Sequence, residues 1–168
     1  LIIMRSEFIK ELNPLIAEIH AGLSGGKETL SIAYEPNVSP ENFREQLAKN
    51  QFQEIRQRQT LTGPHRDDLN FIVNGTDIRR FGSQGQQRTA ALSLKMSEIY
   101  LVEKVTKDHP VLLLDDVLSE LDSSRQNYLL QSIHNIQTVI TCTGLDELIE
   151  NNFSIDRVFR VTEGKIDF

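Results

Sequence analysis

The first third of the chain carries helical and strand-like patterns of hydrophobic residues. Hydrophobic positions three or four apart predict an amphipathic helix, in which Pro14 either introduces a kink or starts a second part behind Asn13. The hydrophobic residues of this helix are Phe8, Leu12, Leu15 and Ile19. A polar glycine-rich turn leads to residues 30–34, whose alternation predicts a strand. Ser39-Pro40 predicts the start of a second helix. Its hydrophobic face holds Ala48, Phe52 and Ile55.

A β-hairpin and a long helix are expected next. Residues 69–73 alternate with period two, and Asn74-Gly75 is a strong turn signal, so residues 76–81 should form the return strand. The polar loop 81–88, with the sequence F-G-S-Q-G-Q-Q-R, then opens the helix. The predicted apolar face of that helix is Ala90, Leu94, Ser97, Leu101 and Val105.

The last third of the chain alternates predicted strands with predicted helices. Residues 111–114 are four consecutive apolar residues, which fit a strand buried on both faces, and residues 138–141 predict another strand. Asp122 can cap the intervening helix, whose apolar positions are Leu129, Ile133 and Ile136. A brief helix near residues 146–149 and a final strand pair, 157–161 and 165–168, complete the pattern. The alternation is typical of an α/β fold with a mainly parallel sheet.

Two adjacent carboxylates, Asp115 and Asp116, follow the strand at 111–114. In open α/β sheets ligands bind at the carboxyl ends of strands, and a carboxylate there commonly holds Mg²⁺ beside a phosphate. The second acid could orient a water molecule against that phosphate. The pattern is that of a Walker B motif. Taken alone, it also fits a core strand that ends in solvated acids before a helix.

The loop at Ser83 has the composition of an anion site. Its backbone N–H groups, the Ser83 hydroxyl and the positive end of the following helix dipole converge on one place. A second glycine-rich segment, residues 22–29, resembles a phosphate-binding loop but departs from G-x-x-x-x-G-K-[ST] at both ends: Ala21 replaces the first glycine and Glu28 replaces the hydroxyl residue. That segment is interpreted as an ordinary turn, and His65 has no nearby residues to complete a metal site.

Composition and charge narrow the classes of protein. The 168 residues are 39% hydrophobic and 25% charged, which is ordinary for a globular chain. A single cysteine, Cys142, and the lack of an apolar run of about 18 residues lead us to expect a soluble, cytoplasmic protein without a membrane span. The net charge of −6 argues against a surface that binds nucleic acid throughout. Residues 56–88, however, hold six arginines and three acids, either a local basic strip or a solvated charged face.

These motifs together resemble a known family. The loop G-S-Q-G-Q-Q-R, the strand V-L-L-L-D-D and the S-E-L-D that follows resemble, in this order, the signature motif, Walker B motif and D-loop of SMC-like ABC-type ATPase heads. The surrounding T-L-T-G-P-H-R-D-D-L and F-G-S-Q-G-Q-Q-R-T resemble the RecF family of bacterial recombination and gap-repair proteins. The resemblance covers residues 59–146 and implies a P-loop NTPase fold of the ABC/SMC-like head type, present as a partial lobe with a small helical lid subdomain.

The resemblance also implies a role for individual residues. In such heads two subunits enclose two ATP molecules, so the signature residues would reach the γ-phosphate of ATP held by the other subunit. These residues are Ser83, Gln84, Gly85 and Gln86. Asp115 would hold Mg²⁺ through its water shell, Asp116 would polarise the attacking water, and Asp122 would lie across the dimer interface. ATP would then join the subunits and its hydrolysis would release them.

Two positions differ from many ABC-type enzymes. Asp116 replaces the more common glutamate and is one methylene shorter, which should position water less well. After the strand at 138–141, where many of these enzymes carry a switch histidine, this chain has Thr141-Cys142-Thr143-Gly144. A hydroxyl or another residue must then sense the γ-phosphate, and both differences predict a slow ATPase.

The resemblance divides the chain at residue 58. Residues 1–58 would belong to the lid subdomain and residues 59–168 to the C-terminal part of the head. No segment matches the P-loop, which this family carries in its N-terminal lobe, so we expect the sequence to be a fragment of a longer protein. By itself it should neither bind ATP tightly nor hydrolyse it, and it should expose an apolar sheet edge.

RecF-family membership would imply ATP-controlled binding to gapped DNA and to junctions between single-stranded and duplex DNA. It would also imply cooperation with RecO and RecR in loading RecA, in DNA repair, recombination, replication and the SOS response. The arginines of residues 56–88 could contribute salt-sensitive contacts to DNA phosphates.

Two other classes of function remain open at this stage. In a Mg²⁺-dependent phosphoryl or phosphodiester hydrolase, Asp115, Asp116 and Glu120 would bind metal directly, but the Ser83 loop would have no role. In a non-catalytic interaction module, all the motifs would be relics.

Overall fold

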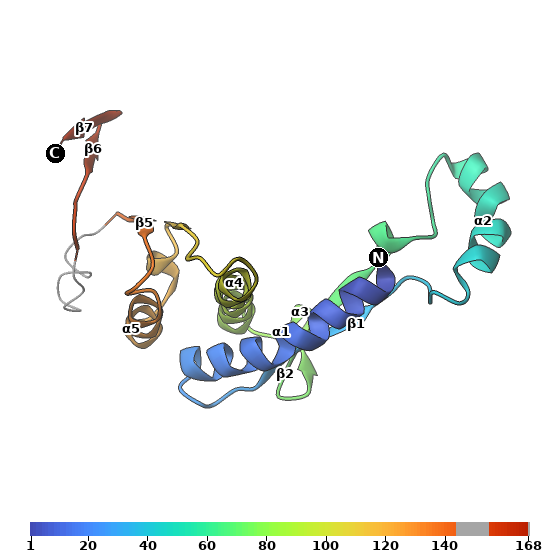
Figure 1. Ribbon diagram of the computed structural model, residues 1–168, viewed down its shortest axis with the longest axis horizontal. Helices are drawn as coiled ribbons and strands as arrows, with labels where there is room; N and C mark the ends of the chain where they lie inside the picture. Colours follow the sequence, from blue (N-terminus) through green and yellow to red (C-terminus); the bar gives the residue numbers. More distant parts are fainter. Residues whose placement is uncertain (144–154, 168) are drawn as a thin grey trace. The chain divides into compact units, whose positions relative to one another are not determined.

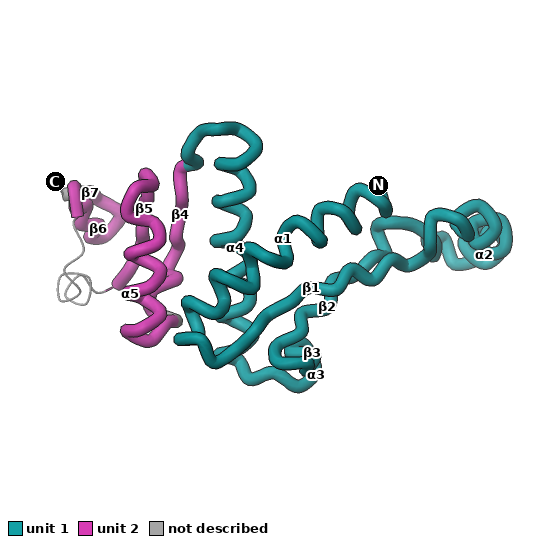
Figure 2. Tube along the Cα trace, turned by 60° about the horizontal axis from the view of Figure 1, so that its bottom comes forward, with its two compact units in different colours: residues 1–110 teal, residues 111–168 magenta. Residues whose placement is uncertain are grey.

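The computed structural model describes residues 1–143 and 155–167, and the chain divides into two compact units, residues 1–110 and 111–168 (Figure 2). The boundary predicted at residue 58 lies inside the first of these units, which ends at residue 110. Each unit has its own secondary structure, and each is described separately.

The first unit combines four helices of different length with a three-stranded antiparallel sheet of order β1-β2-β3. Its elements are α1 (Ile2–Leu23), β1 (Leu30–Glu35), α2 (Phe43–Gln57), the short 3₁₀ helix η1 (Pro64–Arg66), β2 (Asp68–Val73), β3 (Thr76–Asp77), α3 (Ile78–Phe81) and α4 (Gln84–Thr106) (Figure 1). The two helices, the strands and the hairpin predicted up to residue 75 are confirmed. Asn74 and Gly75 both have positive φ, as a two-residue hairpin turn requires.

The predicted return strand, residues 76–81, was wrong beyond its second residue. β3 ends at Asp77, whose carboxylate accepts a hydrogen bond of 2.9 Å from the Arg79 N–H and so caps the short helix α3. An aspartate that can cap a helix ended the strand earlier than its hydrophobic alternation indicated.

The core of the first unit lies where α1 packs against the sheet and against α4. The buried residues of this core come from five elements: Ile9, Leu12 and Ile16 of α1, Leu30 and Ile32 of β1, Val73 of β2, Ile78 of α3 and Ala90 of α4. Asn13, on the same helix, holds the outer edge of β1: its amide accepts from the Ile32 N–H at 2.7 Å and donates to the Ile32 carbonyl at 2.9 Å. One side chain thereby satisfies both backbone groups at an edge strand.

The two predicted helix faces need correction. No residue of α2 is buried, and Phe52 and Ile55 are 81% and 71% exposed, so its hydrophobic face has no cover among the described residues. The helix is preceded by Asn42 at its N-cap position, not by Ser39. On α4, Val105 is 75% exposed, whereas the buried residues include hydroxyl side chains. The buried face of α4 is Thr89, Ala90, Leu92, Ser93, Met96, Ser97 and Ile99.

The hydroxyl residues can be buried on α4 because each bonds to its own helix. Thr89, Ser93 and Ser97 donate to the carbonyls four residues earlier at 2.6–2.7 Å. This back-bonding removes the cost of burying an unpaired hydroxyl. The predicted face was therefore right at Ala90 and Ser97, wrong at Val105, and lacked the buried hydroxyl residues Thr89 and Ser93.

The second unit contains β4 (Leu112–Asp115), the 3₁₀ helix η2 (Leu118–Glu120), α5 (Ser123–Ser132), β5 (Thr138–Thr141), β6 (Arg160–Thr162) and β7 (Lys165–Asp167). β4 and β5 are parallel, with Leu112 opposite Thr138 and Asp115 opposite Thr141, and β6 pairs antiparallel with β7. Leu113 is 72% exposed, so the expectation of a strand buried on both faces was wrong for the described part of the chain. The helix predicted near residues 146–149 lies outside the described residues.

The motif T-G-P-H-R-D-D organises one end of the first unit through Asp67. This carboxylate accepts from the Tyr34 hydroxyl at 2.5 Å, from the Asn37 N–H at 2.9 Å and from the Arg5 guanidinium at 2.7 Å. Arg5 also donates to the Pro64 carbonyl. Burial acts to raise the pKa of Asp67, but these donors outweigh it and hold the pKa below its ordinary value.

Replacing a core residue of α1 tests this arrangement. Ile16→Ala should lower the free energy of unfolding by about 2–5 kcal/mol, because Ile16 is fully buried and its removal leaves a cavity. The matched control is Ile3→Ala on the same helix, where the side chain is 59% exposed and the change should stay within about 0.5 kcal/mol. Urea unfolding measures both values, and equal losses would contradict the assigned core.

The contact between Tyr34 and Asp67 gives a titration test. Burial of Tyr34 and the neighbouring Asp67 carboxylate raise the pKa of the phenol above its ordinary value, since both disfavour the phenolate. Asp67→Asn should lower the pKa of Tyr34, because it removes the negative charge but not the burial. Ultraviolet titration, with Tyr34→Phe to identify the signal and Asp68→Asn as control, measures the change. An unchanged pKa in Asp67→Asn would contradict the assignment.

Candidate functional site

The predicted anion loop forms the N-terminus of α4. Ser83 is the N-cap residue: its hydroxyl oxygen accepts from the Gln86 N–H at 3.2 Å, and the Gln86 side-chain oxygen accepts from the Ser83 N–H at 3.0 Å. This reciprocal pair is a capping box, which satisfies two of the four backbone donors left open at a helix start. The sequence S-Q-G-Q thus contains both partners of the capping box.

The other two donors of this turn remain available. The N–H groups of Gln84 and Gly85 have no acceptor among the described residues, and Ser83, Gln84 and Gly85 are all exposed. A Cβ added at Gly85 would meet no other atom closer than the Ser83 hydroxyl at 3.9 Å. Packing within the chain therefore does not require glycine here, although glycine weakens a helix by roughly 0.5–1 kcal/mol relative to alanine. A glycine in this place gives an approaching group close access to the backbone.

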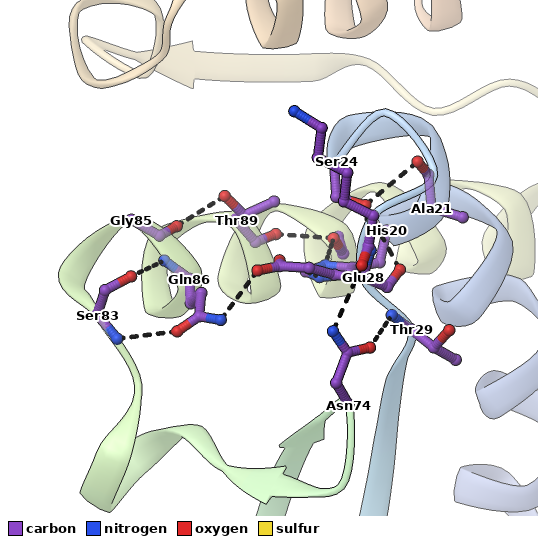
Figure 3. A network of polar contacts seen from close by, with 12 residues as sticks. His20, Ala21, Ser24, Glu28, Thr29, Asn74, Ser83, Gly85, Gln86 and Thr89 are labelled. Atoms are coloured by element: carbon purple, nitrogen blue, oxygen red, sulfur yellow. Dashed lines mark hydrogen bonds and ion pairs between the residues drawn. The ribbon is translucent and has the colours of Figure 1, made fainter.

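Gln86 differs from its three neighbours in the loop. Its side-chain nitrogen donates to Glu28 at 2.9 Å, while its side-chain oxygen is used in the capping box (Figure 3). Both ends of the amide are therefore engaged within the first unit. Sequence reasoning had missed Glu28, which is 58 positions away from Gln86 and had entered only as the residue that spoiled a P-loop pattern.

Gly82 allows the tight entry into this loop. A Cβ at Gly82 would lie 2.6 Å from the Ile78 carbonyl oxygen and from the Ile78 Cβ. Any side chain at this position would push the loop away from the end of α3. The close approach fixes where α4 begins relative to the preceding short helix.

The two predicted acids lie at the carboxyl end of β4, in the second unit. Asp115 is the last residue of the strand and is opposite Thr141, the last residue of β5. The Thr141 hydroxyl donates to the Asp115 carboxylate at 2.5 Å and accepts from the Asp116 N–H at 3.0 Å. A single hydroxyl therefore connects the neighbouring aspartates.

Asp116 has a left-handed backbone conformation with φ of 52°. Its N–H bonds to both the carbonyl and the hydroxyl of Thr141, at 3.1 and 3.0 Å, which holds the backbone after the strand. Aspartate tolerates this conformation better than most residues. Both Asp115 and Asp116 have exposed side chains, as a site for a charged ligand requires.

Asp122 has the cap position that the sequence predicted for it. Its carboxylate accepts from the Arg125 N–H at 3.0 Å and pairs with the Arg125 guanidinium at 2.7 Å. The residue is exposed and starts α5. The role of Asp122 as the N-cap residue of α5 is sufficient to explain its position.

The donor set at β4 suits a magnesium ion that is shared with a phosphate. Among the described residues there is no cluster of three or more side chains that could hold a metal by themselves. Mg²⁺ in phosphate-binding proteins is commonly held by one or two carboxylates together with substrate oxygens and water, and Asp115 fits that pattern. The side chain of Glu120, the third acid of the alternative hydrolase, lies outside the description.

The basic segment is partly neutralised by its own acids. Arg79 forms a two-pronged pair with Asp68 at 2.5 and 2.7 Å, and Arg80 lies 3.5 Å from Asp77. Hydrogen bonding from Arg79 lowers the pKa of Asp68 to about 2. The local excess of positive charge is therefore less available to an outside partner than the arginine count indicated.

No described helix has the length and apolar character of a membrane span.

The Ser83 loop belongs to the first unit and the paired aspartates belong to the second. Each half of the predicted site is thus formed within one unit, from residues that are local to it.

No family model matches the chain. The chain is 55% identical over 163 residues to the DNA replication and repair protein RecF of Agathobacter rectalis, and 44% identical over 167 residues to RecF of Clostridium perfringens. These matches cover 97% and 96% of this chain but only 45% and 46% of the relatives. The chain therefore spans less than half the length of these relatives.

Solved structures agree with the sequence relatives. A structure of the recombination mediator protein RecF with ATPrS, in the RecFOR pathway, superposes with a TM-score of 0.80 at 34% identity, covering 98% of this chain and 45% of that one. An SMC ATPase structure superposes with a TM-score of 0.59 at 16% identity, which is a likeness of fold alone. These neighbours confirm the predicted fold class, that of P-loop ATPase heads. Over nearly its whole length, this chain matches part of a RecF protein.

Proposed function

We propose that this chain is part of a RecF-type ATPase head whose loop at Ser83 binds the γ-phosphate of an ATP molecule held mainly by a second protomer. One observation carries the proposal: the Gln84 and Gly85 N–H groups and the Ser83 hydroxyl are exposed together at the start of a long helix, without other acceptors among the described residues for the two N–H groups. A phosphate oxygen supplies the acceptor that these groups lack.

The strength of such a site explains why two protomers are needed. A helix N-terminus stabilises an anion by about 0.3–1 kcal/mol when exposed and by up to about 2 kcal/mol when partly buried. Even the upper value changes affinity by only about thirtyfold, which is far too little for this loop alone to bind ATP from solution. The loop can therefore add to binding only when another surface already holds the nucleotide. ATP then joins the two surfaces, and its loss separates them.

The second unit would supply the hydrolytic half of the site. Asp115 would hold Mg²⁺ through its water shell, and the ion, when bound, would neutralise charge on the phosphates. Asp116 would accept a proton from the attacking water, and Thr141 would hold both aspartates in place through its hydroxyl. Asp122 would lie at the interface with the other protomer. The short side chain of Asp116 supports slow hydrolysis, suited to timing the release of the protomers.

The comparisons support a role in DNA repair. The relatives are DNA replication and repair proteins, and the solved RecF structures are of a recombination mediator with ATP or ATPrS. We infer that the full-length protein binds DNA gaps and duplex junctions when ATP joins two copies, and that it works with RecO and RecR in loading RecA. Exposed arginines of residues 56–88 for which the described part of the chain supplies no acid partner, such as Arg58, would contribute sequence-independent phosphate contacts. The chain by itself, without a P-loop, should not hydrolyse ATP.

The loop at Ser83 can be tested by blocking it. In the full-length protein, Ser83→Arg should abolish ATP-dependent dimerisation, because a long cation fills the anion site and removes the capping hydroxyl. Binding of ATP to the separate protomer should change less than about threefold, since most of that contact lies elsewhere. Analytical ultracentrifugation with and without ATP measures the first value, and nucleotide titration measures the second.

The matched control for Ser83→Arg is Gln131→Arg, which adds the same side chain at an exposed position of α5. That variant should dimerise like the wild type. Dimerisation of Ser83→Arg at wild-type ATP concentrations would refute the proposed role of the loop.

The role of Thr141 gives a second test. Thr141→Val should reduce the ATPase kcat of the full-length protein by about ten- to a hundredfold, because a hydrogen bond to a charged group contributes about 1.5–3 kcal/mol. Thr141→Ser should keep most of the activity because it retains the hydroxyl. The control Thr138→Val makes the same change at the other end of β5. Steady-state ATPase assays compare the three variants, and equal rates in Thr141→Val and the wild type would exclude the role.

A further inference from the structure

The carboxylate of Glu28, which lies outside the predicted site, contacts the loop at Ser83 through Gln86. This loop, residues 82–88, is called the signature loop below. Glu28 lies in the turn between α1 and β1, and its backbone is fixed on both sides of this turn (Figure 3). The Glu28 N–H donates to the Ser24 hydroxyl at 3.2 Å. Asn74 of the hairpin accepts from the neighbouring Thr29 N–H at 2.9 Å. The turn at residues 22–29, which resembles a phosphate-binding loop in sequence, is therefore held by hydrogen bonds that fix the position of Glu28.

The Glu28 carboxylate bridges two partners with its two oxygens. One oxygen accepts from the Gln86 side-chain nitrogen at 2.9 Å, and the other lies 3.2 Å from His20 Nε2. The Glu28 side chain is 19% exposed and the His20 side chain is fully buried. The bridge thus connects the start of α4 to the buried side of α1.

His20 connects Ser93 to Glu28 through its two ring nitrogens. Ser93 gives its one hydroxyl proton to the Thr89 carbonyl at 2.7 Å, so it accepts from His20 Nδ1 at 3.0 Å. The other ring nitrogen, Nε2, lies 3.2 Å from the Glu28 carboxylate, so both nitrogens of this fully buried ring have a polar partner.

The same bridge fixes which way the Gln86 amide faces. The carboxylate oxygen facing Gln86 is an acceptor, so the Gln86 nitrogen must face Glu28 and the Gln86 oxygen must face the Ser83 N–H. Without Glu28, the amide could turn over and present its NH₂ group to another N–H donor. The capping box would then lose one of its two bonds, and the first turn of α4 would loosen.

We propose that Glu28, held by His20, is a positioning residue for the signature loop: it locks the Gln86 amide, so that the Gln84 and Gly85 N–H groups stay directed at the bound phosphate. The effect on nucleotide binding rests on the proposed function, whereas the effect on the loop does not. Gln86 thereby acts through the capping box and Glu28 acts through Gln86.

Hydrogen exchange in the nucleotide-free, full-length protein tests the loop directly. Glu28→Ala should increase exchange of the Ser83 and Gln86 amides, the two that the capping box protects, by about fivefold, the factor expected from losing a typical helix cap. Glu28→Gln should preserve wild-type exchange, because its oxygen can accept from Gln86 while its NH₂ donates to a neutral His20. The control Glu18→Ala removes an exposed carboxylate from α1 and should change nothing.

Glu28→Asp covers the case in which Glu28→Ala does not fold. It keeps the charge near His20, but its side chain is one methylene shorter and cannot bridge both partners, so it should also increase exchange. Wild-type exchange in the folded variants that break the bridge, or raised exchange in Glu28→Gln, would overturn the proposal.

ATP-dependent dimerisation separates positioning from general stability. Glu28→Ala, or Glu28→Asp in its place, should raise the ATP concentration at half-dimerisation by about fivefold. In a Gln86→Ala background the same substitution should cause no further increase. An equal increase in both backgrounds would overturn the proposal, because Glu28 would then act independently of Gln86. If ATP does not dimerise the wild type, the proposed function fails, and the exchange experiment still decides the role of Glu28.

Discussion

The division of backbone donors in the first turn of α4 is the constraint on which the candidate site depends. A helix start leaves four N–H groups open, and a buried or closely packed start would satisfy all of them within the chain. Here the capping box satisfies the Ser83 and Gln86 N–H groups and leaves those of Gln84 and Gly85 exposed. The helix start is therefore capped within the chain while two of its backbone donors stay exposed.

The polar interior between α1 and α4 keeps that helix start in place. Hydroxyl groups on the buried face of α4 bond back to their own helix, and one of them also receives His20. A buried polar network in which every member is hydrogen-bonded is rigid, because breaking any bond leaves an unpaired polar group in the low-dielectric interior of the protein. The connection from His20 through Glu28 to Gln86 thus transmits the position of α1 to the loop.

The second unit places two aspartates, Asp115 and Asp116, next to each other at the end of β4. Thr141 donates to the Asp115 carboxylate and accepts from the Asp116 N–H, so one hydroxyl orients the Asp115 side chain and fixes the Asp116 backbone at the end of a parallel strand pair. The exposed Leu113 shows that this strand pair has a face not covered by the described residues. The chain spans less than half the length of these relatives.

The sequence by itself determined what depends on near neighbours. The periodicities of α1 and β2, the Asn74-Gly75 turn, the Asp122 cap and the acids after β4 all follow from residues within a few positions of one another. Only the tertiary structure decided the exposed face of α2, the hydroxyl-lined buried face of α4 and the contact of Glu28 with Gln86. These depend on which surfaces meet in space, and hydrogen bonds between residues far apart in the chain leave no periodic pattern in the sequence.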